Sequence, residues 1–298
     1  MTHNDRRQTV ANSPLPTPYL PSLAGNWLDV INADAPLGQV RHALFDFDGT
    51  ISTIRQGWEE IMRPLMMEMI SDGVELAAER RAEIEAEVAD YVDLSTGILT
   101  IKQMEWLAEA VRRYGMAQTP RSAREYKAIY NERLLRPVRA RLERLARGEV
   151  VADELMVAGA RRFVEALSRR GVALYLASGT DHVYVAEESG ALGMAPLFGS
   201  KIYGALDETE AHDKALIIQR ILDDHGLRGT ELLVVGDGPV EIREAKARGA
   251  LALGVASNEV ERSGWNERKR QRLLKANADL LIGDFTHADD LARLLIGQ

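Results

Sequence analysis

The order of apolar and helical segments predicts an α/β protein in which a parallel sheet is interrupted by an all-helical insertion. An apolar strand is expected at 42–47, and the pattern is then helical, without a strand signal, from 55 to about 148. From 150 onward strands alternate with helices, which is typical of a parallel sheet with helices on both faces. The sheet therefore begins before the helical insertion and resumes after it.

The inserted segment divides into four expected helices. The first carries an apolar face at helical spacing, formed by Trp58, Ile61, Met62, Leu65, Met66 and Met69. The other three are expected at 75–93, 99–114 and 120–147, with breaks at glycines and at Pro120. We therefore assign residues 55–150 to a separate helical domain.

The alternating segment supplies the remainder of the sheet. Its strands are expected at 172–177, 201–203, 231–235, 251–255 and 279–282. Its helices are expected at 154–170, 181–190, 214–225, 239–248 and 287–296. Residues 25–54 and 151–298 together are expected to form one core domain. The proline-rich start, residues 1–24, is expected to be a flexible leader.

Length and composition favour a globular protein of about two domains. The 298 residues are 46% hydrophobic and carry a formal net charge of −8, which argues against non-specific nucleic-acid binding. The sequence has no cysteine, and this excludes disulfides, thiolate nucleophiles and cysteine-bound zinc. No apolar run approaches the ~18 residues of a membrane helix, and the first residues are polar rather than signal-like. We expect a cytoplasmic protein that binds neither nucleic acid nor membranes.

Two aspartates one residue apart end the first strand. Asp46 and Asp48 would point to the same side at the strand end. Gly49 lets the backbone turn sharply there, and Thr50 adds a hydroxyl. Two close carboxylates repel each other unless a cation or a shared proton relieves the repulsion. The pattern indicates a divalent metal with one carboxylate free as a nucleophile, although the same residues also suit an ordinary strand-to-turn exit.

Two later segments offer groups that could hold a phosphate. Ser178 and Gly179 follow the strand 172–177 and combine a hydroxyl with a flexible backbone, as a helix N-cap also would. Lys214 begins a helix after Asp213, a position where its charge opposes the helix dipole. Such local conflicts are expected at functional sites, although most lysines are merely solvated. Lys201 competes for the same role, but it precedes a strand.

A pair of acids follows the most apolar strand. Asp237 stands at the strand exit, and Glu241 lies about one helical turn further on. Gly238 suits the cap of the following helix and Pro239 its first position. Both acids are placed to bind a metal or to support its ligands, while a well-capped strand-to-helix turn is the structural alternative.

The four motifs in this order resemble those of the haloacid dehalogenase-like hydrolase superfamily, most closely its phosphatases with a helical (C1-type) cap. The resemblance covers about 42–285 and includes the helical insertion directly after the first motif. It implies a Rossmann-like parallel sheet core with 55–150 as the cap domain. The sequence departs from the common pattern at Ser178, where threonine is more frequent, and at Glu241, where aspartate is usual.

The resemblance also implies a mechanism. Asp46 would attack a phosphate monoester to form an aspartyl-phosphate, and Asp48 would act as acid and then base. Ser178 and Lys214 would hold the phosphoryl oxygens. Mg²⁺ would be the cofactor. Its expected ligands are Asp46, the backbone carbonyl of Asp48, and Asp237, with Glu241 as a ligand or a support.

Substrate selection is expected in the cap. Thr50, Gly179, Arg55 and Lys102 are the substrate-binding candidates, with weaker expectations for Trp58, Glu59, Thr96, Gly97 and Gln103. Two arginine-rich stretches, 136–147 and 266–272, are interpreted as an amphipathic helix and a solvated helix face.

The resulting hypothesis is a Mg²⁺-dependent phosphatase for a small phosphorylated metabolite, with a sugar phosphate as first guess. A phosphomutase that uses the same core is the alternative within enzymes. A C–halogen hydrolase would have no need of Asp48 as an acid. A catalytically silent binding protein is disfavoured by the presence of every expected catalytic residue type, and a kinase by the lack of a Gly-x-x-x-x-Gly-Lys loop.

Overall fold

The computed structural model describes residues 27–206 and 213–297. The predicted leader, 1–24, lies outside the described residues. The predicted core is present as a seven-stranded sheet in the order β1-β7-β6-β5-β2-β3-β4. The strands are β1 (Leu28–Val30), β2 (His42–Phe45), β3 (Ala173–Asp181), β4 (Ile202–Ala205), β5 (Leu232–Gly236), β6 (Leu251–Val255) and β7 (Leu280–Ile282).

All neighbouring strands are parallel except β1, which pairs with β7 in the antiparallel direction. The parallel core agrees with the predicted alternation of strands and helices. The sequence pattern did not predict β1, because three residues are too few to establish a period. The segment 25–40 thus contributes an edge strand to the sheet.

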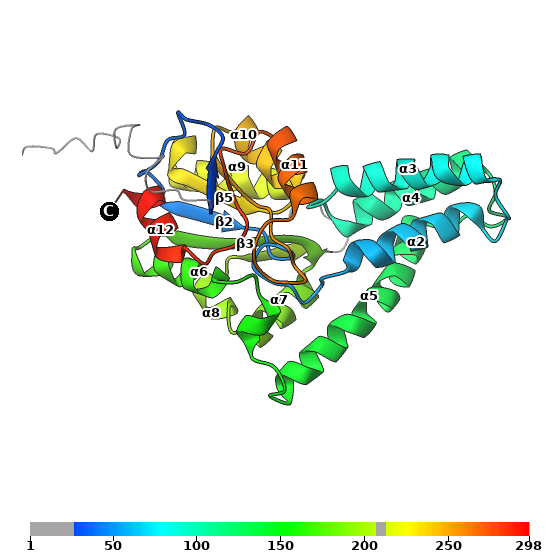
Figure 1. The fold of residues 1–298 in the computed structure, drawn as a ribbon, viewed down its shortest axis with the longest axis horizontal. Coiled ribbons are helices and arrows are strands. Elements are labelled where there is room, and N and C mark those ends of the chain that lie inside the picture. Colours follow the sequence, from blue (N-terminus) through cyan, green and yellow to red (C-terminus); the bar gives the residue numbers. More distant parts are fainter. Residues whose placement is uncertain (1–26, 207–212, 298) are drawn as a thin grey trace, which may run out of the picture.

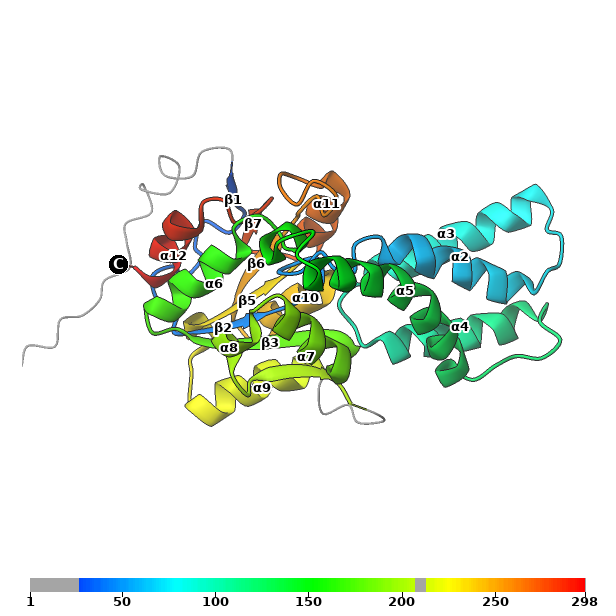
Figure 2. The same ribbon diagram turned by 90° about the horizontal axis from the view of Figure 1, so that it is seen from below.

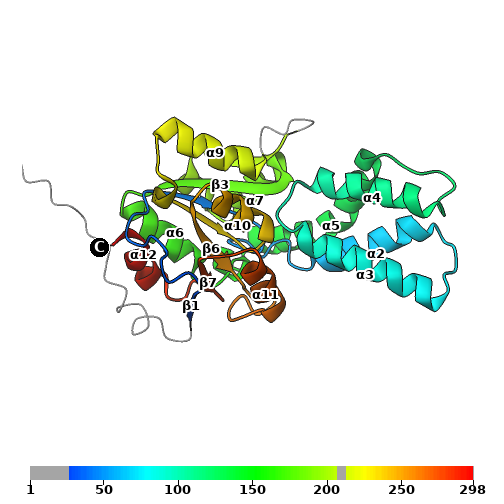
Figure 3. The same ribbon diagram turned by 90° about the horizontal axis from the view of Figure 1, so that it is seen from above.

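Helices cover both faces of the sheet (Figure 1). One face carries α9 (Lys214–His225), α10 (Pro239–Ala247) and α11 (Glu267–Lys275), which are in front in the view from above (Figure 3). The other face carries α6 (Ala160–Arg169), α7 (His182–Ala191), α8 (Ala195–Phe198) and α12 (Ala288–Ile296). In the view from below, α6, α7 and α8 lie in front of the sheet (Figure 2).

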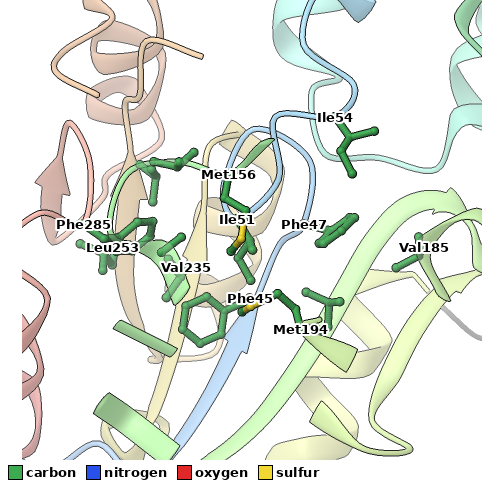
Figure 4. Close-up of a cluster of buried hydrophobic side chains, with 14 of the residues drawn as sticks. Phe45, Phe47, Ile51, Ile54, Met156, Val185, Met194, Val235, Leu253 and Phe285 are labelled. Atoms are coloured by element: carbon green, nitrogen blue, oxygen red, sulfur yellow. The ribbon is translucent and has the colours of Figure 1, made fainter. Parts of the chain in front are cut away.

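Side chains of each strand alternate between two apolar clusters, one on each face. Leu44 and Val234 belong to the cluster under α9 and α10, whereas Phe45 and Val235 belong to the opposite cluster. Figure 4 shows Phe45 and Val235 among the side chains of that second cluster. Every one of these four side chains is at most 2% exposed. The strands therefore place the backbone rigidly up to the residue before Asp46.

Four described helices make up the inserted segment, which we call the cap, and project from one end of the core (Figures 1 and 2). They are α2 (Trp58–Ser71), α3 (Ala78–Leu94), α4 (Thr100–Tyr114) and α5 (Ala123–Ala146). The predicted apolar face of α2 packs inward, with Met62, Leu65 and Met66 fully buried. None of the helices described here is both long and apolar enough to cross a membrane.

Helix α9 and strand β6 have the predicted bounds, but the predicted helix 154–170 does not form as one unit. A 3₁₀ turn covers Ala152–Leu155, and α6 begins only at Ala160. Gly159 separates them with a φ of +77°, and a Cβ there would collide with the Phe285 carbonyl. The close approach of the chain near Phe285, which no local pattern encodes, therefore sets the start of α6.

The loop between α3 and α4, residues 95–99, closes the cap onto the core, and we call it the cap loop. Gly97 has a φ of +97°, and a Cβ on it would collide with the Glu241 carboxylate. A Cβ on Gly179, in β3, would collide with the Ile98 carbonyl. Backbone therefore meets backbone at this contact, and a side chain at Gly179 would separate the two domains locally.

Gly179→Ala is expected to displace the cap loop while leaving the sheet intact, because the collision lies between the new methyl group and cap backbone. Amide hydrogen exchange of residues 95–103 should accelerate in this variant. The matched control is Gly190→Ala in α7, where a Cβ meets no atom within 4 Å. That change should leave exchange in 95–103 unaltered and stabilise the protein by roughly 0.4–1 kcal/mol. Unchanged exchange in Gly179→Ala would contradict the steric contact.

Candidate active site

The carboxyl ends of β2, β3 and β5 enclose a small cavity beneath the cap, which we call the site cavity. Because β2 lies between β3 and β5, the segments that leave these three strands meet at one edge of the sheet. The cavity has a volume of about 70 Å³. Its walls include the predicted residues Asp46, Asp48, Arg55, Ser178, Gly179 and Asp237.

Asp46 is buried at the end of β2 and held from two sides. Lys214 Nζ donates to its Oδ1 at 2.6 Å, and Thr50 Oγ1 donates to its Oδ2 at 3.1 Å. Burial raises the pKa of Asp46, and the Lys214 charge opposes this shift. Burial alone would lower the pKa of Lys214, but the adjacent carboxylates outweigh it and the pKa is raised. Lys214 therefore stays positively charged beside Asp46 and does not transfer its proton.

Three buried acids converge beside Lys214. Asp46, Asp237 and Glu241 each offer a carboxylate oxygen, and these oxygens lie within 4.8 Å of one another. Glu241 Oε1 accepts from the Gly238 backbone N–H at 2.8 Å, and its Oε2 accepts from Lys214 at 3.2 Å. Carboxylate oxygens at this spacing are the ligand type that hard divalent cations prefer. The donor set therefore fits a magnesium-type ion, and each of the three acids is also held by donors of the protein.

Asp48 has hydrogen-bond partners that differ from those of the three acids. Its Oδ2 accepts hydrogen bonds from Ser178 Oγ at 3.0 Å and from Thr180 Oγ1 at 3.1 Å. Its Oδ1 is buried and has no hydrogen-bond partner among the described residues. The nearest cation to Oδ1 is the Arg55 Nε, 3.7 Å away. Two hydroxyls thus fix the carboxyl group through Oδ2, and Oδ1 is left without a hydrogen-bond donor in the described part of the chain.

Ser178 lies in a different structural position from the one expected from the sequence. β3 continues through Ser178 and Thr180 to Asp181, with an irregular register after Ala177, so Ser178 is neither a strand exit nor a helix cap. Its hydroxyl donates to Asp48. Thr180, which the sequence analysis missed, makes the equivalent contact.

Arg55 is buried against a partner that sequence analysis also missed. Its Nε lies 3.1 Å from both carboxylate oxygens of Glu188, and its Nη2 lies 2.6 Å from Oε1. Arg55 is 5% exposed and Glu188 1% exposed. Burial raises the pKa of Glu188 to about 7, although Arg55 acts to lower it. Glu188 stands in α7, far from Arg55 in sequence, and no local pattern indicates the pairing.

The interpretation of 266–272 as a solvated helix face is wrong for two of its residues. Lys269 is buried in α11, and its Nζ lies 2.7 Å from Asp237 Oδ2 and 2.6 Å from Glu259 Oε1. Arg272 donates to the Asp237 carbonyl and to Thr96 of the cap loop. One face of α11 carries Lys269, Arg272 and the buried Leu273. Their spacing, at i, i+3 and i+4, indicates a side of the helix that faces inward.

Two other lysines, Lys102 and Lys201, lie outside the site cavity. Lys102 forms an ion pair with Glu105 at 3.4 Å and borders a separate hollow between the cap and the ends of β3 and β4, so the structure does not bring it to the site cavity. Lys201 stacks over the Tyr175 ring at 4.7 Å, which leaves Lys214 as the lysine beside Asp46.

The cap contributes the outer wall of the site cavity. The predicted residues Trp58, Thr96, Gly97 and Gln103 line it. Ile98, Thr100, Tyr130 and Leu134 line it as well and were not predicted. Glu59 does not line it and instead pairs with Arg63 at 2.8 Å and with Arg272 at 3.4 Å.

Solved structures share this architecture. A predicted phosphoglycolate phosphatase from Haemophilus somnus 129PT superposes with a TM-score of 0.53 at 18% identity, covering 87% of this chain and 99% of that one. A β-phosphoglucomutase from Clostridium difficile superposes with a TM-score of 0.51 at 14% identity, covering 83% and 92%. At such identities the likeness establishes the fold alone.

Comparison with curated proteins gave no match. A family model described as haloacid dehalogenase-like hydrolase matches residues 40–249, which include Asp46, Ser178, Lys214 and Asp237. This match extends over more than half of the chain and spans the whole cap. The chain therefore belongs to the haloacid dehalogenase-like hydrolase family.

Proposed function

We propose that this protein is a Mg²⁺-dependent phosphatase that hydrolyses a small phosphorylated metabolite, with sugar phosphates as the first class to test. The observation that carries the proposal is that two neighbouring aspartates have different hydrogen-bond partners. Asp46 is held by Lys214 beside the buried acids, whereas Asp48 is held separately by two hydroxyls. One carboxylate is thus placed as a nucleophile and the other as a proton carrier.

The cation would be held by the carboxylates of Asp46 and Asp237 and by the Asp48 backbone carbonyl, with Glu241 as a further ligand or a support. When bound, Mg²⁺ supplies positive charge that lowers the repulsion between an anionic phosphate and an anionic nucleophile. Lys214 adds a fixed positive charge at the same place, and Glu241 fixes the Lys214 ammonium at 3.2 Å. The protein's own contribution is therefore a preorganised positive potential next to Asp46.

In the first step a carboxylate oxygen of Asp46 forms a bond to phosphorus, and the ester P–O bond breaks. Asp48 gives its proton to the departing alcohol oxygen. In the second step water attacks the phosphorus, Asp48 accepts a proton from it, and the P–O bond to Asp46 breaks. Phosphate leaves and both aspartates return to their starting state. Ser178 and Thr180 orient Asp48 for both transfers through its Oδ2.

The closed cap supports hydrolysis of a small ester. The cap loop, Trp58 and Leu134 bound the cavity on the side away from the strands. These residues would contact the alcohol part of a substrate whose phosphoryl group faces Asp46. Cap opening would be needed for entry and release, as for lids in general.

Asp46→Asn should abolish phosphate release from sugar phosphates, by at least about 1,000-fold, because the amide cannot form the acyl-phosphate bond. The measurement is phosphate release in the presence of Mg²⁺. Asp34→Asn, at an exposed position, is the control and should keep full activity. Residual turnover of the Asp46 variant near the wild-type rate would overturn the mechanism.

Asp48→Asn should separate the two chemical steps when p-nitrophenyl phosphate is the substrate. Nitrophenolate departs without a proton, so the first step survives, whereas the second step lacks its base. The expected result in rapid-mixing experiments is a burst of about one equivalent of nitrophenolate followed by slow turnover. Asp46→Asn should give no burst. A steady rate without a burst in Asp48→Asn would contradict the assigned role.

Removal of divalent cations with EDTA should stop turnover, and added Mg²⁺ should restore it. Calorimetry should show Mg²⁺ binding weakened about 10- to 100-fold or more in Asp237→Asn, with Asp34→Asn unchanged. Metal binding to a carboxylate competes with its protonation, and burial raises the pKa of Asp46. The affinity for Mg²⁺ should therefore fall as the pH is lowered, with proton release on binding. A pH-independent affinity would argue against Asp46 as a ligand.

A further inference from the structure

We propose that the site cavity selects phosphate monoesters whose leaving alcohol carries no second anionic group, such as neutral polyols and sugars rather than phosphorylated acids or bisphosphates. This inference rests on the proposed phosphatase function and names its substrate class. It is carried by the charges that line the cavity and by the way the Arg55–Glu188 ion pair is built.

The described lining of the site cavity is rich in negative charge. Asp46, Asp48 and Asp237 all contribute carboxylates to it. Arg55 is the one cationic side chain among the described lining residues. Lys214, behind this wall, already contacts Asp46 and Glu241 and serves the reacting phosphate. A second anion on the substrate would therefore need Arg55 as its partner.

Arg55 is already neutralised by a carboxylate of the protein. Three N···O contacts of 2.6–3.1 Å join it to Glu188. Both side chains are almost completely excluded from solvent, and breaking a buried pair leaves an uncompensated charge. A substrate carboxylate or second phosphate would have to displace Glu188 or lie unpaired near Asp48. Either event is unfavourable, and a neutral alcohol avoids both.

The remaining lining suits a neutral alcohol. Thr100 and Gln103 contribute uncharged polar side chains from α4, whose donors bond to the Gly179 carbonyl and to Ser95. Trp58, Tyr130 and Leu134 present apolar surface from α2 and α5. Convergent uncharged polar groups beside aromatic surface are the usual composition of a pocket for a small uncharged ligand.

The test compares substrates that differ mainly in one anionic group. Glycerol 3-phosphate is paired with 3-phosphoglycerate, and glucose 6-phosphate with 6-phosphogluconate, for the Mg²⁺-loaded full chain. The value of kcat/KM should be at least about 100-fold higher for the neutral member of each pair, in keeping with the cost of an unpaired buried charge. Equal values, or a preference for the acid in either pair, would overturn the inference.

Glu188→Gln tests the cause of the discrimination. The amide keeps the shape of the side chain but removes its charge, so Arg55 keeps, among the described residues, only the longer 3.7 Å contact with Asp48 as an anionic partner. The ratio within each pair should therefore fall at least about tenfold through a lower KM for the acid. Glu187→Gln, the exposed neighbour on α7, is the matched control and should keep the wild-type ratio. An unchanged ratio in a folded Glu188→Gln variant would overturn the assignment to this pair.

The wild-type ratios decide the inference even if Glu188→Gln does not fold. Failure of the inference is also distinct from failure of the proposed function. Hydrolysis of p-nitrophenyl phosphate and of the acidic esters, with no preference for the neutral ones, would overturn the inference alone. Absence of phosphate release from p-nitrophenyl phosphate and all four esters would overturn the phosphatase proposal, and the inference with it.

Discussion

The structure depends on neutralising a group of acids that the sheet brings together at one edge. Asp46, Asp237 and Glu241 are all buried there, and Lys214 and Lys269 enter from α9 and α11 to face them. Removing one partner of such a buried pair typically costs about 3–5 kcal/mol, because the remaining charge has no water to solvate it. The stability of this edge and its capacity to hold a cation are thus properties of the same residues.

This constraint explains why the site draws on most of the chain. Asp46 and Asp237 follow β2 and β5, and Glu241 lies in α10. Lys214 comes from the start of α9, and Lys269 comes from α11, beyond the segment matched by the family model. Arg272, one turn after Lys269, also reaches Thr96 in the cap loop. Helix α11 therefore contacts both the group of buried acids and the cap. The position of the cap thus depends on the geometry around Asp237.

Sequence patterns predicted the fold well, because strand and helix periods are local. They also predicted the residues at strand ends, such as Asp46 and Asp237, which chain topology alone brings together. They could not predict Glu188 or the burial of Lys269, since both depend on which distant helix packs beside the site. The position of Lys102 could not be predicted for the same reason: its spacing after a helix break suits many positions, and packing places it beside Glu105.

The order of strands in the sheet has a consequence for how the chain folds. β2 pairs only with β3 and β5 in the described sheet, through His42 with Ala173 and Leu232, and the whole cap lies between β2 and these partners in sequence. Contacts so distant are slow to form, because loop-closure entropy opposes them until the partners exist. The cap helices can meet their sequence neighbours much earlier during synthesis. Strand β2, and the aspartate that follows it, thus have both neighbouring strands only when the chain has grown past Gly236.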